Sequence, residues 1–333
     1  MRSHRTNLRV LEAVNPPDGT TRYIDQVIAF ADEDVQFSYI SPRKLLSRDY
    51  DVVHFHWPEM VLRHRWRLIE SAKCAAFDVW IRALKRRRTA IIRTLHNPRP
   101  HEDTRPVVAR SLRRLDAATD LFVAINSTDE APEASAYIPH GHYRDRFADH
   151  AKDASTRGRI LYAGLIRPYK GVEQLIAAFT DHDDDELTLR IVGKPTPELR
   201  EAIVHAGETD PRITSRLDFV PDDEFVTEIT RAELVCLPYR DLHNSGILLV
   251  ALSLDRPVLV PDTPSTRALA DEVGPGWVTT FTGEIDADDL ARAISVARTG
   301  DRSSRPALAD RDWQLVGERY SRAFREARVR AQR

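Results

Sequence analysis

Short apolar runs alternate with amphipathic segments along most of the chain, and this rhythm constrains the fold more than any other feature. Residues 51–57 and 90–96 are typical of strands, whereas residues 68–84 and 107–117 have the apolar spacing of helices. Strands that alternate with helices are typical of a parallel sheet covered by helices on both faces. The sequence therefore predicts an α/β protein.

The alternation of apolar runs and amphipathic segments is interrupted once and then resumes. Residues 144–159 are polar and charged, so we place a domain boundary there. At 333 residues the chain exceeds the usual length of one domain, about 100–200 residues. We predict an N-terminal domain over residues 1–150 and a C-terminal domain over residues 151–310. Residues 311–333 are predicted to form a helix that packs back toward the N-terminal domain, through an apolar stripe of Trp313, Val316, Tyr320 and Phe324.

Composition excludes several classes of protein. The net charge of −2 gives no overall field that would attract nucleic acid. Cys74 and Cys236 lie in apolar runs, which predicts buried thiols rather than a disulfide or a metal pair. No run approaches the roughly 20 apolar residues that span a bilayer, and the first residues lack the pattern of a signal peptide. We therefore expect a cytoplasmic protein.

The loop after the strand at 159–164 carries a candidate phosphate site. Gly164 ends the strand, and Arg167 and Lys170 precede a helix that begins near Gly171. The free amides at a helix N-terminus bind phosphate, and two cations add charge pairing. Ligands bind at the carboxyl ends of strands in open α/β sheets, which favours this interpretation over a loop with two solvated cations.

This Gly-x-x-Arg-x-x-Lys-Gly segment resembles the donor-phosphate site of GT-B-fold glycosyltransferases. Segments 189–194, 219–224, 237–246 and 256–261 resemble later landmarks of that family, in the same order. The resemblance implies two Rossmann-like parallel-sheet domains that face each other across a cleft, with a crossing C-terminal helix. It also implies a nucleoside-diphosphate sugar whose diphosphate is held by Arg167 and Lys170.

The same resemblance implies further residues around the donor. Segment 237–246 is similar to the loop that meets the sugar and phosphates, and residues 18–20 lie where the family has a small-residue loop. The implied donor contacts, besides the two cations, are Gly164, Tyr239, Asn244, Ser245, Gly246 and Gly19.

The resemblance breaks at two positions that bear on mechanism. Retaining members carry two glutamates where this chain has His243 and Ala251. Their absence favours inversion over retention. The Asn-Ser-Gly sequence that follows His243 resembles bacterial exopolysaccharide enzymes, some of which use GDP-mannose.

The N-terminal domain has a second group of candidate residues. His54, His56 and Glu59 come at the end of one predicted strand, and His96 ends the next, followed by Asn97, His101 and Glu102. Both strand ends open onto one crevice in a doubly wound sheet, and His and Glu are the usual proton-transfer residues. The spacing gives no convincing third metal ligand, so we predict no metal. His54 also fits a hydrogen-bonded core histidine.

Segment 94–97 resembles the strand end whose histidine faces the donor sugar in GT-B enzymes. We therefore expect His96 and Glu59 to contact sugar and remove the acceptor proton, with His56 in reserve. His140 precedes the domain boundary and fits either a position facing the cleft or one that braces the linker. The Lys85–Arg88 run follows an apolar helix and fits either a solvated helix end or contact with an anionic membrane.

The combined prediction is a metal-independent hexosyltransferase with no cofactor besides its donor, GDP-mannose or a UDP-sugar. The acceptor is a hydroxyl of a glycan, a glycolipid or a small molecule. Two alternatives stay open: a GT-B protein that binds a nucleotide sugar without catalysis, and a sugar-nucleotide epimerase. A dinucleotide-dependent oxidoreductase is disfavoured because no Gly-x-Gly-x-x-Gly follows either first strand.

Overall fold

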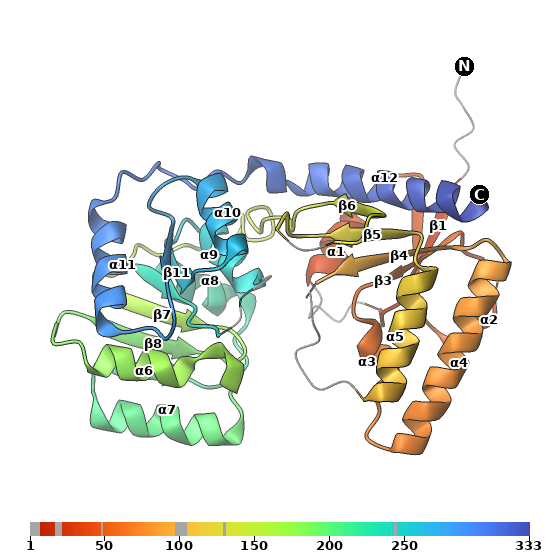
Figure 1. Cartoon of the computed structure of the whole chain (residues 1–333). Coiled ribbons are helices and arrows are strands. Elements are labelled where there is room, and N and C mark those ends of the chain that lie inside the picture. The colour runs from red at the N-terminus through yellow and green to blue at the C-terminus, as the bar shows by residue number, and fades with distance from the viewer. Residues whose placement is uncertain are drawn as a thin grey trace. The chain divides into compact units, whose positions relative to one another are not determined.

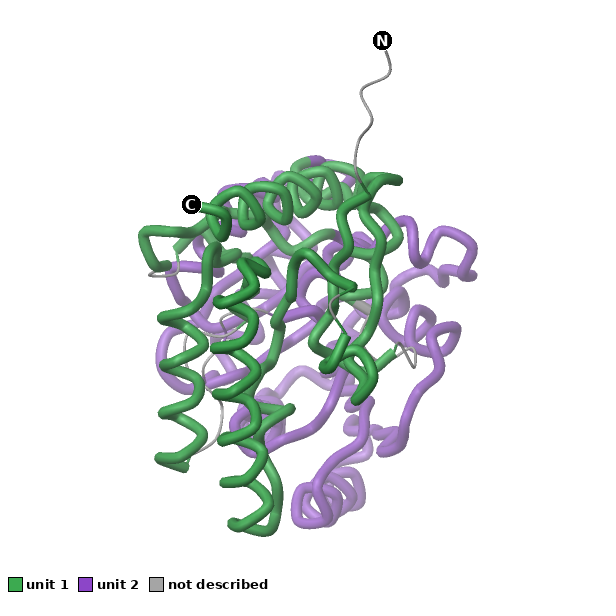
Figure 2. The backbone as a smooth tube through the Cα atoms, turned by 90° about the vertical axis from the view of Figure 1, so that its right-hand side faces the viewer, with its two compact units in different colours: residues 1–141, 310–333 green, residues 142–309 purple. Residues whose placement is uncertain are grey.

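A computed structural model gives the fold of the chain in two compact units. It describes residues 7–16, 22–47, 49–96, 105–128, 131–240, 242 and 245–333. Unit 1 comprises residues 1–141 and 310–333, and unit 2 comprises residues 142–309 (Figure 2). The sequence prediction places this division after residue 150. Each unit contains a six-stranded parallel sheet with helices packed on it (Figure 1), so the predicted α/β class is confirmed.

Unit 1 has the strand order β2-β1-β3-β4-β5-β6. The strands are β1 Leu8–Glu12, β2 Val35–Tyr39, β3 Val52–Phe55, β4 Ala90–Leu95, β5 Leu121–Ala124 and β6 Ser135–Tyr137. The helices are α1 Arg22–Ala29, α2 Pro42–Leu46, α3 Pro58–Leu62, α4 Arg67–Arg86, α5 Pro106–Ala118 and α12 Trp313–Gln332. The central strands are buried on both faces, which explains their continuous Val and Ile runs.

Helix α12 completes the core of unit 1. The helix runs along the sheet of unit 1 (Figure 1). Trp313, Val316, Tyr320 and Phe324 are fully buried against α1 and the sheet, which confirms the predicted apolar stripe. A Cβ atom at Gly317 would lie 1.9 Å from the carbonyl oxygen at the end of α1, so this close approach needs glycine. Unit 1 therefore draws its core from both ends of the sequence.

Unit 2 has the strand order β12-β11-β10-β7-β8-β9. The strands are β7 Arg159–Ala163, β8 Thr188–Val192, β9 Ile213–Arg216, β10 Leu234–Cys236, β11 Val258–Pro261 and β12 Val278–Phe281. The helices are α6 Val172–Thr180, α7 Pro197–Thr209, α8 Asp222–Thr230, α9 Gly246–Ser253, α10 Pro264–Val273 and α11 Ala287–Thr299, with 3-10 turns η1 Pro168–Lys170 and η2 Ala309–Arg311. Read from the first strand of the unit, this is the Rossmann order, in which the direction of winding reverses between β7 and β10.

Several elements are not among those that the periodicity predicts. Helices α2 and α3 are five residues long and each begins at a proline, so they are too short to show a helical repeat. Strand β6 has three residues. The periodicity also does not predict helices α10 and α11 or strand β12. Both cysteines are buried free thiols, as predicted.

Candidate functional site

In unit 1, polar side chains gather where β1, β3 and β4 end. Glu12 is the last residue of β1 and lies in register with His54 of β3. His56 follows β3 and His96 follows β4. Because parallel strands present their carboxyl ends at one edge of the sheet, the four side chains meet although they are far apart in sequence.

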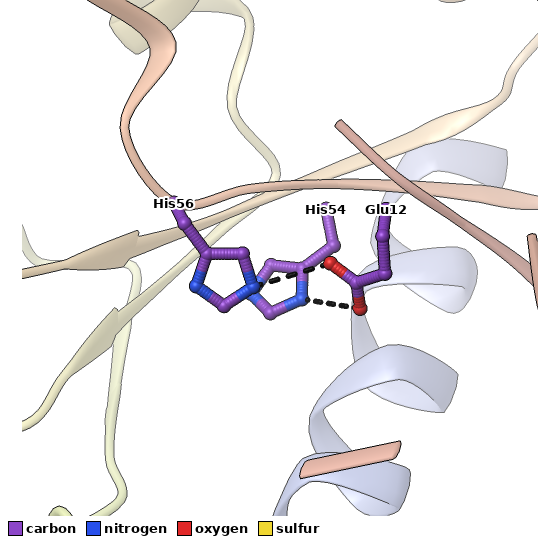
Figure 3. A group of neighbouring side chains, drawn as sticks. All are labelled: Glu12, His54 and His56. Atoms are coloured by element: carbon purple, nitrogen blue, oxygen red, sulfur yellow. Dashed lines mark hydrogen bonds and ion pairs between the residues drawn. The ribbon is translucent and has the colours of Figure 1, made fainter. Parts of the chain in front are cut away.

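The centre of this group is the Glu12 carboxylate (Figure 3). Its Oε1 lies 3.0 Å from Nδ1 of His54, and its Oε2 lies 3.1 Å from Nε2 of His56. Burial alone would raise the pKa of Glu12, but the two imidazoles outweigh it and hold the pKa at about 2. Glu12 is therefore ionised and can only accept, so both imidazole nitrogens donate to it.

This arrangement fixes the tautomers of the next two rings. Burial, together with the neighbouring His54, lowers the pKa of His56 to about 4, so the ring is neutral and carries its one proton on Nε2. Its Nδ1 is then an acceptor, and the partner is Nε2 of His96 at 3.0 Å. Burial also lowers the pKa of His96. His96 is thus a neutral ring that donates from Nε2 and whose acceptor nitrogen is Nδ1.

A second branch runs from His54 into the core. Nε2 of His54 lies 2.8 Å from Oγ1 of Thr94, which lies 3.0 Å from the hydroxyl of Tyr320. The Tyr320 hydroxyl in turn lies 2.7 Å from that of Tyr23. His54 is fully buried with both ring nitrogens hydrogen-bonded, which agrees with its interpretation as a core histidine. This branch ties helices α1 and α12 to the sheet.

Aromatic rings surround His96. The ring of Trp57 stacks on it at 4.2 Å, and Tyr23 meets it edge-on at 5.2 Å. The ring of His140 also packs against Tyr23, with 4.6 Å between ring centres, and meets Trp313. Burial lowers the pKa of His140 to about 4. His140 therefore packs within unit 1 as a neutral ring.

Glu59 lies apart from this cluster. It is partly exposed in the first turn of α3, and within the described ranges no hydrogen bond or ion pair joins its carboxylate to another residue. Its role stays a prediction. The carboxylate of the cluster is Glu12, which the sequence reasoning missed. The available signal was a single acidic residue inside the apolar run Leu8–Val14.

Glu12, His54 and His56 also have the chemistry of metal ligands. One donor atom from each lies within 4.8 Å of the other two. Histidine and carboxylate ligands are those of zinc sites, although here each imidazole nitrogen that faces Glu12 is engaged in a hydrogen bond. The predicted absence of metal stays a prediction.

In unit 2, glycines bring two loops together at the reversal point between β7 and β10. Gly171 has φ +68°, and a Cβ atom there would lie 2.0 Å from the Pro238 carbonyl oxygen. Gly164 has φ +117°, and a Cβ atom there would lie 3.2 Å from the side chain of Ile247. The loop 164–171 therefore packs against the loop after β10 and the start of α9, where Rossmann folds bind their ligands.

The two predicted cations lie in this loop. Nη1 of Arg167 donates to the carbonyl oxygens of Ile166 at 2.7 Å and Lys194 at 3.1 Å. Nζ of Lys170 lies 4.9 Å from the ring centre of Tyr239. Burial, together with the charge of Arg167, lowers the pKa of Lys170 to about 8. A bound anion would stabilise the charged form of Lys170 and offset the repulsion between the two cations, so this pair is suited to a phosphate group.

The start of α9 adds backbone donors. The Ser245 side chain caps the helix by accepting from the Leu248 amide at 3.4 Å. The amides of Gly246 and Ile247 have no partner within the helix, as in the first turn of any helix. Burial raises the pKa of Tyr239, so its hydroxyl stays neutral. The structure thus brings together Gly164, Lys170, Tyr239 and Gly246, whereas Asn244 and Gly19 lie outside the described residues.

Comparisons with known proteins extend over nearly the whole chain. Residues 157–297 match the sequence profile of the family described as glycosyl transferases group 1. Two relatives from Xanthomonas campestris pv. campestris are named GDP-mannose:glycolipid 4-beta-D-mannosyltransferase. They are 42% and 41% identical over 323 residues, which cover 96% of this chain and 93% of each relative.

Solved structures resemble the fold at low identity. The Anabaena protein HepE in complex with UDP has a TM-score of 0.60 at 14% identity, covering 98% of this chain and 97% of HepE. AviGT4, a glycosyltransferase involved in avilamycin A biosynthesis, has a TM-score of 0.58 at 14% identity, covering 97% of this chain and 98% of AviGT4. At such identities the likeness shows the fold alone.

Proposed function

Since the chain belongs to the group 1 glycosyltransferases, we propose that it transfers a mannosyl group from GDP-mannose to a hydroxyl of a glycolipid, with inversion. Glycosyltransferase activity and the GT-B fold, both predicted from the sequence, are confirmed by the family and its structural relatives. The choice of GDP-mannose and of a glycolipid rests on the name of the relatives.

Inversion follows from the linkages that this donor and product would have. GDP-mannose carries its mannose in α linkage, and the relatives are named for a β product. A single displacement accounts for this change. The acceptor oxygen forms a bond to the anomeric carbon as the bond to the diphosphate breaks, GDP leaves, and a base takes the acceptor proton. The lack of glutamate at positions 243 and 251 supports the same assignment.

His96 is our candidate for that base. It is neutral, and the hydrogen bond that Nε2 donates to His56 leaves Nδ1 as the nitrogen able to take a proton. The positive charge that His96 gains lies two hydrogen bonds from the Glu12 carboxylate, which stabilises it electrostatically. His56 then acts as a positioning residue. Glu59, a partly exposed carboxylate, is the second candidate for the base.

Arg167, Lys170 and the first amides of α9 are proposed to hold the diphosphate. Two cations and a helix N-terminus stabilise the negative charge that develops on the leaving group. This positive potential supports catalysis without a metal ion. The pair of cations in a loop at the reversal point, with the lowered pKa of Lys170, is the observation that carries the donor assignment.

The test combines donor binding with turnover. GDP-mannose should raise the melting temperature of the protein, and Arg167→Ala should weaken GDP binding by about 10- to 100-fold, because a charge-assisted hydrogen bond contributes about 1.5–3 kcal/mol. Arg292→Ala, on the exposed side of α11, is the matched control and should bind normally. GDP release should require an acceptor and should persist in EDTA, and the product should be a β-mannoside.

His96→Ala should separate binding from chemistry. We expect kcat to fall by about 10²- to 10⁴-fold while GDP affinity stays unchanged, since general-base catalysis contributes that much. If kcat is unchanged in this variant, His96 is not the base, and Glu59 becomes the candidate. Failure of GDP-, UDP- and dTDP-sugars alike to bind would refute the donor assignment.

A further inference from the structure

Helix α4 is apolar on two opposite faces. Its inner face packs Cys74, Phe77, Ile81 and Leu84 into the core of unit 1. Its outward-facing side carries an apolar row of exposed side chains, which we call the outer stripe: Leu68, Ala72, Ala75, Ala76 and Val79. Positions 68, 72, 75 and 79 share one side of a helix. Surface helices normally present polar residues on such a face, so an apolar row there calls for an explanation.

Large apolar side chains are exposed both in the outer stripe and in the sequence just before α4. Leu68 is 87% exposed and Val79 is 58% exposed. In the segment between α3 and α4, Trp66 is 58% exposed, and Met60 at α3 is 72% exposed. The guanidinium of Arg65 lies over the Trp66 ring, 5.1 Å from its centre. An exposed tryptophan beside arginines is typical of the boundary between water and lipid.

Basic residues flank the outer stripe at both ends. Arg63, Arg65 and Arg67 precede it, and Arg82 and the Lys85–Arg88 run follow it. From Arg67 to Arg82 the helix rises about 22 Å, at about 1.5 Å per residue. Between these two arginines both acidic residues are buried and paired, Glu70 with Arg105 and Asp78 with Arg114. Lys73, the other charged residue of the stretch, is half-buried, and its Nζ donates to the carbonyl oxygen of Arg63 at 3.4 Å.

The basic residues at both ends of the outer stripe favour an anionic bilayer over a second copy of the chain as the partner. In a second copy of the chain packed across the outer stripe, the basic ends would meet basic ends, since both ends of the helix are positive. An anionic bilayer instead offers acyl chains to the stripe and negative headgroups to both ends. No helix in the described part of the chain is long and apolar enough to cross a membrane, so α4 would lie in the plane of the surface.

We propose that α4 docks on an anionic bilayer, with the outer stripe toward the acyl chains and Trp66 and both basic ends among the headgroups. This extends the proposed glycolipid acceptor, because the enzyme would then work where that acceptor is embedded. The Lys85–Arg88 run forms one end of the docking surface.

The test is flotation of the full chain with vesicles that contain neither glycolipid nor donor. We expect binding to vesicles of phosphatidylcholine with about 30% phosphatidylglycerol, weak binding to phosphatidylcholine alone, and loss of binding at high salt. The double variant Leu68→Glu/Val79→Glu should lower the partition coefficient at least tenfold, because it places two charges in the acyl region. Val329→Glu, at a 52% exposed valine of α12, is the matched control and should bind normally.

A second variant probes the basic end alone. Replacing Arg63, Arg65 and Arg67 with Gln should weaken binding to the anionic vesicles about a hundredfold, since each basic side chain near such a surface contributes about a fivefold factor. Binding to phosphatidylcholine alone should hardly change. Each variant must retain the wild-type melting temperature, which shows that it folds.

Three results would overturn the proposal. They are failure of the wild-type chain to bind anionic vesicles, flotation of the Leu68→Glu/Val79→Glu variant equal to that of wild type, and a dimer in sedimentation that this variant dissociates. Transfer to a short-chain, water-soluble acceptor is measured separately. If neither the wild type nor any of the variants shows that activity, the proposed function is contradicted. The flotation result then still tests the docking surface by itself.

Discussion

Replacing Glu12 with Gln should damage both stability and catalysis. An amide offers one acceptor oxygen and one NH₂ donor, whereas the two imidazoles both donate to Glu12. If the NH₂ group faces His56, that ring must move its proton from Nε2 to Nδ1. Nδ1 of His56 then meets the proton on Nε2 of His96, so His96 must change tautomer too. Nδ1 of His96 then carries the proton and can no longer act as a base.

The pKa of Glu12 sets the size of the effect on stability. The pKa falls from 4.5 to about 2, a difference of 4.5 − 2 = 2.5. At 1.36 kcal/mol for each unit, this corresponds to about 3 kcal/mol of folding free energy. Because the pKa is lowered in the folded state, the stabilisation is complete above pH 4.5 and disappears as the pH falls toward 2. The difference in the free energy of unfolding between wild type and Glu12→Gln, which we call the gap, should likewise be complete above pH 4.5 and disappear as the pH falls toward 2.

Urea unfolding over a pH series measures this gap, and the kcat of both proteins measures the effect on His96. Glu70→Gln is the control, because Glu70 is another buried carboxylate of unit 1, paired with Arg105 at 3.0 Å outside the histidine cluster. It should lower stability and leave kcat unchanged. A gap below about 0.5 kcal/mol at pH 7, or a kcat for Glu12→Gln equal to that of Glu70→Gln, would refute the tautomer reasoning.

Four further outcomes follow from single contacts. The affinity for GDP should fall by up to tenfold per pH unit above pH 8, where Lys170 loses its charge, and Lys170→Arg should remove this fall in calorimetric titrations. His140 has a pKa of about 4 in place of 6.5, so the folded state should lose up to about 3 kcal/mol as the pH falls from 6.5 to 4, and His140→Gln should flatten this slope in urea unfolding. Tyr320→Phe should lower the free energy of unfolding by about 1–2 kcal/mol, because Thr94 and Tyr23 lose a buried partner. Gly171→Ala should lower the melting temperature and GDP affinity together, since the left-handed backbone alone disfavours alanine by about 1–2 kcal/mol and its Cβ would overlap a carbonyl oxygen.

The donor loop of unit 2 could be predicted because its signal is local. Gly164, Arg167, Lys170 and Gly171 lie within eight consecutive residues, and the strand and helix around them each have a clear period. Parallel pairing then fixes where the loop lies, since the end of the strand is the ligand-binding edge. The same reasoning gave the α/β class and the buried stripe of α12.

The histidine cluster could be predicted only in part, because its geometry depends on strand register. Glu12 and His54 are 42 residues apart, and Tyr320 lies 226 residues after Thr94. Nothing in the local sequence of β1 indicates which strand will lie beside it. The exposure of Leu68 and Val79 was missed for a related reason: apolar periodicity indicates a helix but does not tell which of two apolar faces is buried.

The division of unit 1 between the two ends of the sequence has a consequence for synthesis. A ribosome releases residues 142–309 before α12, so the sheet of unit 2 can close while β1, β3 and β4 still lack the helix that covers them. Until Tyr320 and Phe324 arrive, the Thr94 hydroxyl and the neighbouring apolar strands stay open to water and to chaperones. A released chain that ends shortly before residue 313 should therefore hold one folded half and one half that proteases still cut.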